Sequence, residues 1–158
     1  MITLPRLMLL AAAGSLALLL GAFAFQYIGG LAPCKMCLWQ RWPHAFAVVV
    51  GAVTIIISWR ALPLLGAAAA FTSACIGAFH AGVEHGWWDG PSTCTSGPVE
   101  NLSADQLFDQ IMSAPLVRCD EIAWAWMGLS MAGWNAVLSL GLACLWLTVV
   151  FRWRSAGA

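Results

Sequence analysis

The sequence has very little charge. Only 9% of its 158 residues are Asp, Glu, Lys or Arg, whereas 61% are hydrophobic. Soluble globular domains have about 25% charged residues, so this chain cannot cover a water-facing surface, and a soluble enzyme is excluded. The seven basic and seven acidic residues cancel. Without a basic excess, no nucleic-acid partner is expected. The composition predicts a polytopic membrane protein.

Four stretches satisfy the need of a transmembrane helix for about 20 largely apolar residues. They cover about 7–28, 42–59, 61–83 and 124–151. The length favours one membrane domain over residues 1–158. We therefore expect an all-α fold, a bundle of four transmembrane helices. Residues 1–24 partly resemble a signal peptide, but the apolar run continues to Ile28, which favours a span.

The basic residues predict the orientation of these spans. Arg6, Arg60, Arg152 and Arg154 lie at the two ends of the chain and in the second connection. Basic residues near span ends mark the cytoplasmic side, so both termini are expected there. Loops at about 29–41 and 84–121 then face the periplasm. Tyrosine is nearly absent, with one residue, but the ten Trp residues mostly fall near span ends, as in an aromatic belt.

The longer loop holds all seven acidic residues. Within it, residues 103–112 predict a short helix, because Ser103 and Gln106 have the spacing of a capping box. Leu107, Phe108 and Ile111 form its apolar stripe. The stripe fits two placements equally, one on the membrane surface and one packed against the loop itself.

Four of the six cysteines lie in the two outer loops, Cys34 with Cys37 and Cys94 with Cys119. Disulfides persist in the oxidising space outside a bacterial inner membrane. The other two, Cys75 and Cys144, lie within spans at different depths, so we expect them to be unpaired, buried small side chains.

Cys34 and Cys37 form a C-x-x-C motif, whose thiols can reach a low pKa and exchange rapidly. Cys37 opens the second span, where a helix N-terminus favours a thiolate. Arg41 lies one helical turn further on, and His44 continues the same face. Pro43 is expected to delay or kink this helix.

Spacing alone leaves three interpretations open. A redox relay uses both cysteine pairs for electron transfer. A structural tetraspan protein uses them only as braces of an outer loop. A membrane metal protein uses Cys34, Cys37, Cys94 and Cys119 as four zinc ligands. The smallness of the C-x-x-C loop favours chemistry over bracing, because a short loop stabilises little.

The motifs around the cysteines resemble the disulfide bond formation protein B (DsbB) family over nearly the whole chain. The matching features are the C-x-x-C motif with its following arginine, a Glu-His pair before the second cysteine pair, and the entry into the last span. They comprise Pro33–Cys37, Arg41, Glu84-His85, Pro91–Cys94, Cys119, Glu121, Trp124 and Gly128-Leu129. Vitamin K epoxide reductase relatives also couple C-x-x-C to quinones, but near the end of a later span.

The resemblance implies a quinone-linked thiol oxidase of the bacterial inner membrane. It implies that the enzyme re-oxidises a DsbA-like thioredoxin-fold partner in the periplasm and passes the electrons to ubiquinone or menaquinone. By this resemblance, the partner attacks Cys94, whose mate is Cys119, and the pair passes electrons to Cys34. No resident metal is expected.

The resemblance also implies the residues around the quinone. Cys37 contacts it, Arg41 supplies the cation of the site, and His85 lies near the ring. His44 joins this set because it shares a helix face with Cys37 and Arg41. His80, one turn before Glu84, is expected to have a core or headgroup role instead.

Overall fold

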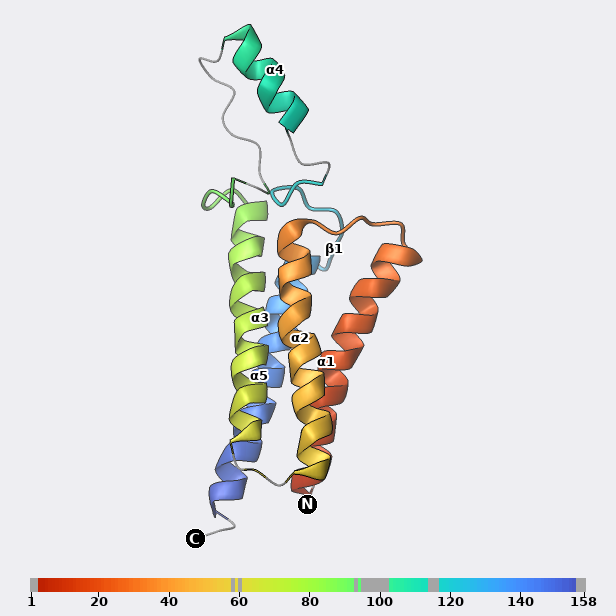
Figure 1. The fold of residues 1–158 in the computed structure, drawn as a ribbon, viewed down its shortest axis with the longest axis vertical. Helices are drawn as coiled ribbons and strands as arrows, with labels where there is room; N and C mark the ends of the chain where they lie inside the picture. The colour runs from red at the N-terminus through yellow and green to blue at the C-terminus, as the bar shows by residue number, and fades with distance from the viewer. Residues whose placement is uncertain are drawn as a thin grey trace.

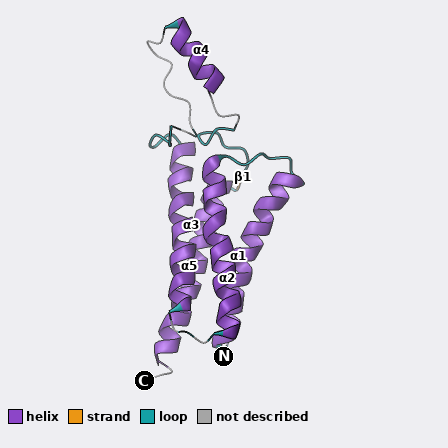
Figure 2. Ribbon diagram, viewed as in Figure 1, coloured by secondary structure: helices purple, strands orange, loops and turns teal. Residues whose placement is uncertain are grey.

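The computed structural model describes residues 3–57, 59, 61–92, 94, 103–113 and 117–155. These residues are mostly helical. The elements are α1 (Leu4–Tyr27), α2 (Lys35–Ile56), α3 (Leu62–Glu84), α4 (Ala104–Ser113), β1 (Ala125–Trp126), β2 (Leu129–Ser130) and α5 (Met131–Ser155). The long helices α1, α2, α3 and α5 run side by side, with both chain ends at one end of the molecule and α4 projecting from the other (Figure 1; Figure 2).

Within the described residues, three helices are long and apolar enough to cross a membrane. They are α1, α3 and the Met131–Trp153 part of α5. Helix α2 has 22 residues, but its first turns carry Lys35, Gln40, Arg41 and His44, which lower its hydropathy. The chain therefore has the character of a multi-pass membrane protein. Arg60, used above for the orientation, lies outside the described residues.

The second helix begins earlier than predicted. It starts at Lys35 rather than near residue 42, and it ends at Ile56. The Sγ atom of Cys34 caps it by accepting the backbone N–H of Cys37 at 3.2 Å. The expected delay at Pro43 is wrong, because the helix is already formed there and continues through it.

The last helix begins later than predicted, at Met131 rather than near residue 124. Residues 125–130 instead form an antiparallel hairpin, in which Ala125 pairs with Ser130 and Trp126 with Leu129. Met127 (φ 51°) and Gly128 (φ 81°) turn the hairpin. Two successive left-handed residues suit the right-handed twist of a tight hairpin. The hydrophobicity of this stretch hides the turn from a span prediction.

Helix α3 packs closely on α5 because small residues face its neighbour. A Cβ atom on Gly66 would lie 2.6 Å from the ring of Trp146, which is fully buried. A Cβ atom on Gly77 would lie 3.0 Å from both Ala132 O and Ala136 N. The backbones of the two helices therefore approach closely, and this positions α5 beside the polar residues of α2 and α3.

The predicted short helix is present as α4, and its capping box forms. The Ser103 N–H donates to Gln106 Oε1 at 3.0 Å, and the Gln106 N–H donates to Ser103 Oγ at 3.3 Å. Phe108 and Ile111 are exposed on it.

The prediction that Cys75 and Cys144 are buried is wrong. Both are exposed free thiols on the outer faces of their helices, although they are unpaired as expected. Their spans are apolar nearly all round, so the sequence does not distinguish an inward face from an outward one.

Candidate functional site

The two cysteine pairs of the outer loops lie together where α2 begins and α3 ends. Cys94 and Cys119 form a disulfide, with Cα atoms 5.4 Å apart. Cys34 and Cys37 are free thiols whose sulfur atoms lie 2.9 Å apart. Cys34, Cys94 and Cys119 are buried in one cluster with Val83, and Cys37 packs against it. Cysteines from the two predicted outer loops are thus brought into a common site.

Cys34 has the surroundings of a stabilised thiolate. It caps the N-terminus of α2, where the helix dipole favours a negative charge. The hydrogen bond with the Cys37 thiol lowers the pKa of Cys34 to about 4; burial opposes this shift, and a contact with His80 adds to it. The sequence pattern favours Cys37 as the thiolate, whereas the structure gives the anion-stabilising contacts to Cys34.

The buried ring of His80 joins the two pairs. Its Nε2 atom lies 3.6 Å from Cys34 Sγ and 3.2 Å from the carbonyl oxygen of Cys119. Its Nδ1 atom lies 3.0 Å from Gln40 Nε2. Glu84, one turn along α3, places a carboxylate oxygen 3.9 Å from Nε2. His80 therefore lies at the junction between the pairs.

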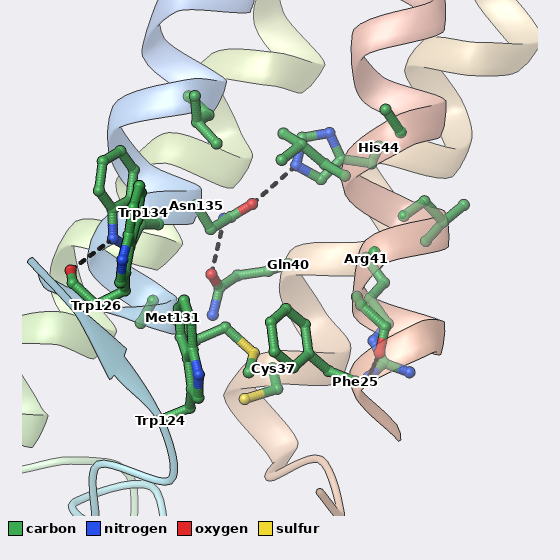
Figure 3. Close-up of a pocket in the computed structure, with 17 residues that line it drawn as sticks. Phe25, Cys37, Gln40, Arg41, His44, Trp124, Trp126, Met131, Trp134 and Asn135 are labelled. Carbon is green, nitrogen blue, oxygen red and sulfur yellow. Dashed lines mark hydrogen bonds between the residues drawn. The ribbon is translucent and has the colours of Figure 1, made fainter. Parts of the chain in front are cut away.

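A cavity of about 380 Å³ lies beside Cys37, between α1, α2, the segment before β1, and α5 (Figure 3). Trp124, Trp126 and Trp134 contribute aromatic walls, and the Trp134 Nε1–H donates to the Trp126 carbonyl at 3.0 Å. Small-molecule sites in proteins have volumes of about 300–1,000 Å³ and mostly apolar walls with a few polar groups. This cavity has those properties.

The polar residues of the cavity come mainly from α2. Arg41 donates to Gln26 Oε1 at 2.5 Å and to the Ala22 carbonyl at 3.4 Å. Its guanidinium also lies over Phe23, 5.1 Å from the ring centroid. These contacts hold the Arg41 head group against α1, on the opposite side of the cavity from α5.

His44 lies further along α2 than Arg41, and its ring points towards Asn135 of α5 (Figure 3). Its Nε2 atom lies 3.0 Å from Asn135 Oδ1, and the hydroxyls of Ser73 and Ser139 lie at 3.0 and 3.1 Å. His44 Nδ1 and Arg41 Nε are buried without a hydrogen-bond partner among the described residues. Buried polar atoms are nearly always paired, so these two atoms fit a polar ligand.

Cys37, Arg41 and His44 are thus brought together, but His85 is not. His85 caps the C-terminus of α3, and its Nδ1 atom lies 2.7 Å from the Ala81 carbonyl. Its ring lies against Trp87, with centroids 5.4 Å apart. The described residues that line the cavity do not include it.

The four cysteines of the metal interpretation are not arranged as a four-thiolate site. Four-cysteine ligation needs thiolates at Cys94 and Cys119, and the disulfide removes them. Among the described residues, the potential ligand atoms that cluster are those of Cys34, Cys37 and His80, all within 4.8 Å of one another.

Sequence reasoning missed Gln40 and Asn135, and it gave His80 only a core or headgroup role. Gln40, His80 and Asn135 are linked by hydrogen bonds between α2, α3 and α5. The available signal was a polar residue inside an otherwise apolar helix, because such residues are costly in a membrane and are usually functional. Sequence alone does not reveal which of them meet.

Comparison with known proteins gives one family over most of the chain. The family model described as disulfide bond formation protein DsbB matches residues 5–149. The protein named Disulfide bond formation protein B from Methylococcus capsulatus is 33% identical over 147 residues, 89% of this chain and 88% of its own. The protein of that name from Pasteurella multocida is also 33% identical, over 87% and 80%. One from a Polaromonas species is 26% identical, over 93% and 90%.

Proposed function

This chain belongs to the DsbB family of disulfide bond formation proteins, and we propose that it oxidises a DsbA-like thioredoxin-fold partner and passes the electrons to a membrane quinone. Membership of the family makes it a disulfide-forming membrane oxidoreductase, and it confirms the resemblance inferred from the motifs. The partner, the quinone and the role of each residue are the proposal.

The observation that carries the proposal is the common site of the two cysteine pairs. The disulfide of Cys94 and Cys119 is packed in one cluster with Cys34, and Cys37 also borders the cavity. Thiol–disulfide exchange needs direct approach of one sulfur to another. Electrons then follow a path of adjacent groups. They pass from the partner to Cys94–Cys119, then to Cys34–Cys37, and then to the cavity.

The residues of the cavity fit a quinone head group. The orphaned Nε–H of Arg41 suits a carbonyl acceptor, and its fixed charge favours negative charge in a poorly hydrated site. His44 donates from Nε2 to Asn135 Oδ1, which leaves Nδ1 as a free acceptor for a hydroxyl proton. Trp124, Trp126 and Trp134 offer apolar surface for the ring. A quinone in this site supplies a two-electron, two-proton acceptor.

In the proposed reaction, each group of this chain has one task. Cys94 and Cys119 are reduced by the partner dithiol and become a disulfide again by reducing Cys34–Cys37. Cys37 borders the cavity and hands on the electrons. Arg41 and His44 bind and orient the acceptor. Ubiquinone and menaquinone share the dicarbonyl ring that these contacts recognise. His85 lies outside the cavity lining, so the proposal gives it no contact with the quinone.

The proposed membrane arrangement has α2 as a fourth span. Its length matches its neighbours, and its polar residues Gln40, Arg41 and His44 face the cavity and the buried network rather than a lipid surface. Both chain ends lie at one end of the bundle, and α2 begins and α3 ends at the other (Figure 1), where the cysteine pairs lie together. We therefore propose cytoplasmic termini in a bacterial inner membrane, with the cysteines on the periplasmic side.

Quinone reduction by the purified protein tests the proposal. A reduced thioredoxin-fold dithiol serves as donor, and quinol formation is followed with ubiquinone and menaquinone analogues. The parent is expected to produce quinol with matching loss of thiol, and Cys37→Ser and Cys94→Ser are expected to abolish it. Absence of quinol from the parent with both acceptors, or persistence in Cys37→Ser, would rule the proposal out.

A further inference from the structure

A buried chain of polar side chains runs from the cysteine site into the bundle. Asn135 Nδ2 donates to Gln40 Oε1 at 2.7 Å. Gln40 Nε2 donates to the Met36 carbonyl at 3.1 Å and lies 3.0 Å from His80 Nδ1. Gln40 and His80 are buried. A polar network among apolar helices is expensive unless it has a task, and the function proposed above gives none to His80.

The hydrogen-bond partners fix which nitrogen of His80 carries the proton. Two contacts fix the orientation of the Gln40 amide. The Met36 carbonyl can only accept, so it faces the Gln40 NH₂ group, and the Asn135 amide N–H can only donate, so it faces the Gln40 oxygen. The NH₂ group therefore also faces His80. Nδ1 of His80 must therefore accept. Nε2 must donate, because the Cys119 carbonyl at 3.2 Å can only accept. The N–H of Nε2 thus lies between the Cys119 carbonyl and Cys34 Sγ, which is 3.6 Å away.

We propose that His80 is a catalytic residue of the exchange between the two cysteine pairs, and that it stabilises Cys34 as a thiolate by hydrogen bonding from Nε2. Gln40, held by Asn135, is the positioning residue that keeps the ring in this tautomer. The inference rests on the relay proposed above, because it assigns His80 to one step of that relay.

The step balances as two thiol–disulfide exchanges. A thiolate of the reduced Cys94/Cys119 pair attacks Cys34 Sγ, which breaks the Cys34–Cys37 bond and releases Cys37. The second cysteine of that pair then attacks its mate, which breaks the mixed disulfide and releases Cys34 as a thiolate. Cys94–Cys119 is oxidised and Cys34–Cys37 is reduced by two electrons. Of the two thiol protons of the first pair, one is taken up by Cys37 and the other is released to solvent, because Cys34 remains a thiolate.

His80 acts when Cys34 leaves. A better-stabilised thiolate is a better leaving group, and a hydrogen bond to an ionised group is stronger than one between neutral groups. The other charged or titratable groups around Cys34 are Cys37 and Arg41 from α2, Glu84 from α3, and Arg118 and Glu121 from the second loop. Of these, Cys37 contacts the Cys34 sulfur directly.

Two amide substitutions provide a matched test. In His80→Gln the side-chain nitrogen replaces Nε2 and still reaches Cys34. In His80→Asn the side-chain oxygen replaces Nδ1 as the acceptor of the Gln40 N–H, and the side-chain nitrogen falls short of Cys34. Both remove the ring and its titration. Thr72→Leu, on the exposed face of α3, controls for substitution in this helix.

The first readout is the pH dependence of Cys34 alkylation in the fully reduced protein, which needs neither partner nor quinone. We expect the midpoint of His80→Asn to rise by about 1–2 pH units and that of His80→Gln to stay near the parent's. Equal midpoints for the two amides would overturn the inference, even if quinone reduction were normal.

The second readout is the rate at which thiols appear at Cys34 and Cys37 after oxidised protein is mixed with a reduced thioredoxin-fold dithiol, without quinone. We expect His80→Asn to be about 10- to 100-fold slower and His80→Gln to recover most of the rate. Equal slowing in both variants would overturn the inference. If the partner fails to reduce Cys94–Cys119 in the parent, the proposed function fails instead, and the alkylation readout still decides the role of His80.

Discussion

Cys34 combines three roles that usually belong to separate residues. It caps α2, it shares a hydrogen bond with Cys37, and it packs against the second cysteine pair. The cap and the hydrogen bond both stabilise negative charge on its sulfur. An ordinary cysteine titrates near pH 8.5, so the difference in reactivity is large enough to measure.

In the reduced protein, Cys34 is expected to stay reactive towards iodoacetamide well into the acidic range. Only the thiolate reacts, and its pKa is lowered to about 4. Reactivity is therefore present above this value and lost as the pH falls through it. Mass spectrometry of the modified peptide at a series of pH values checks this.

Cys37→Ala is expected to shift the same profile to higher pH, because the Cys37 thiol is the main cause of the lowered pKa of Cys34. Cys37→Ser is the matched control, since its hydroxyl keeps a donor in place, and should shift the profile less. An unchanged profile in Cys37→Ala would show that the thiol contact does not stabilise Cys34.

Arg41→Met is expected to raise the KM for quinone by about 10- to 100-fold, because it removes a charged donor from a poorly hydrated cavity. Arg41→Lys keeps the charge but lacks the Nε–H that has no partner among the described residues. Its KM for quinone should therefore lie between those of the parent and Arg41→Met. Steady-state kinetics with each substrate varied separately gives the values. A rise only in the KM for the dithiol partner would contradict the assignment of Arg41 to the quinone.

At the scale of elements, close helix packing holds the site together. α3 supplies His80 and Ser73, while α5 supplies Asn135, and the hydrogen bonds between them need the short distance that Gly66 and Gly77 permit. Packing in a membrane depends on such small residues, because lipid offers no hydrophobic gain for bringing helices together.

Gly66→Val is expected to destabilise the protein by about 1–3 kcal/mol, the usual effect of overpacking. Its Cβ would lie 2.6 Å from the Trp146 ring, which has no free space to retreat into because it is fully buried. Thermal unfolding in detergent measures the change. Gly141→Ala is the control, since no atom of another described residue would lie within 4 Å of the added Cβ; it should be neutral or slightly stabilising. Equal effects of the two would refute the packing argument.

The elements also show what the sequence can predict. Apolar length predicted α1 and α3 nearly to their ends, and the capping box predicted α4. The start of α2 at Lys35 was missed because a cysteine is not a usual N-cap. The start of α5 was missed because Trp124 to Ser130 is as apolar as a span. The contacts of Gln40 with His80 and with Asn135 depend on packing between helices that are distant in the sequence. No local pattern encodes such packing.

At the scale of the whole molecule, the polar chemistry lies at the end of the bundle opposite the chain termini. The chain termini lie at one end, and α2 begins and α3 ends at the other (Figure 1). The cysteine pairs lie together at that second end. The disulfide is almost inaccessible, with Cys94 1% and Cys119 0% exposed. In the proposed relay, a partner thiolate therefore reaches Cys94 only after the residues that cover this sulfur have moved.

Cys119→Ser is expected to form a mixed disulfide with a DsbA-like partner that lacks its second active-site cysteine, whereas Cys94→Ser is not. Removing the mate leaves the attacked cysteine free to hold the partner, and Cys94 is the proposed point of attack. Oxidative capture followed by mass spectrometry of the linked peptides identifies the bond. Equal capture by both variants, or capture at Cys119 alone, would contradict this assignment.

The central claim is that both cysteine pairs pass their electrons through Cys37 to a quinone in the adjacent cavity. Its most direct measurement is the quinol yield when the fully reduced protein is mixed with excess quinone in lipid nanodiscs. The relay predicts one quinol for each of the pairs Cys34/Cys37 and Cys94/Cys119, and half that yield from the Cys94→Ser/Cys119→Ser double variant. A parent yield equal to that of the double variant would show that the second pair does not feed the first.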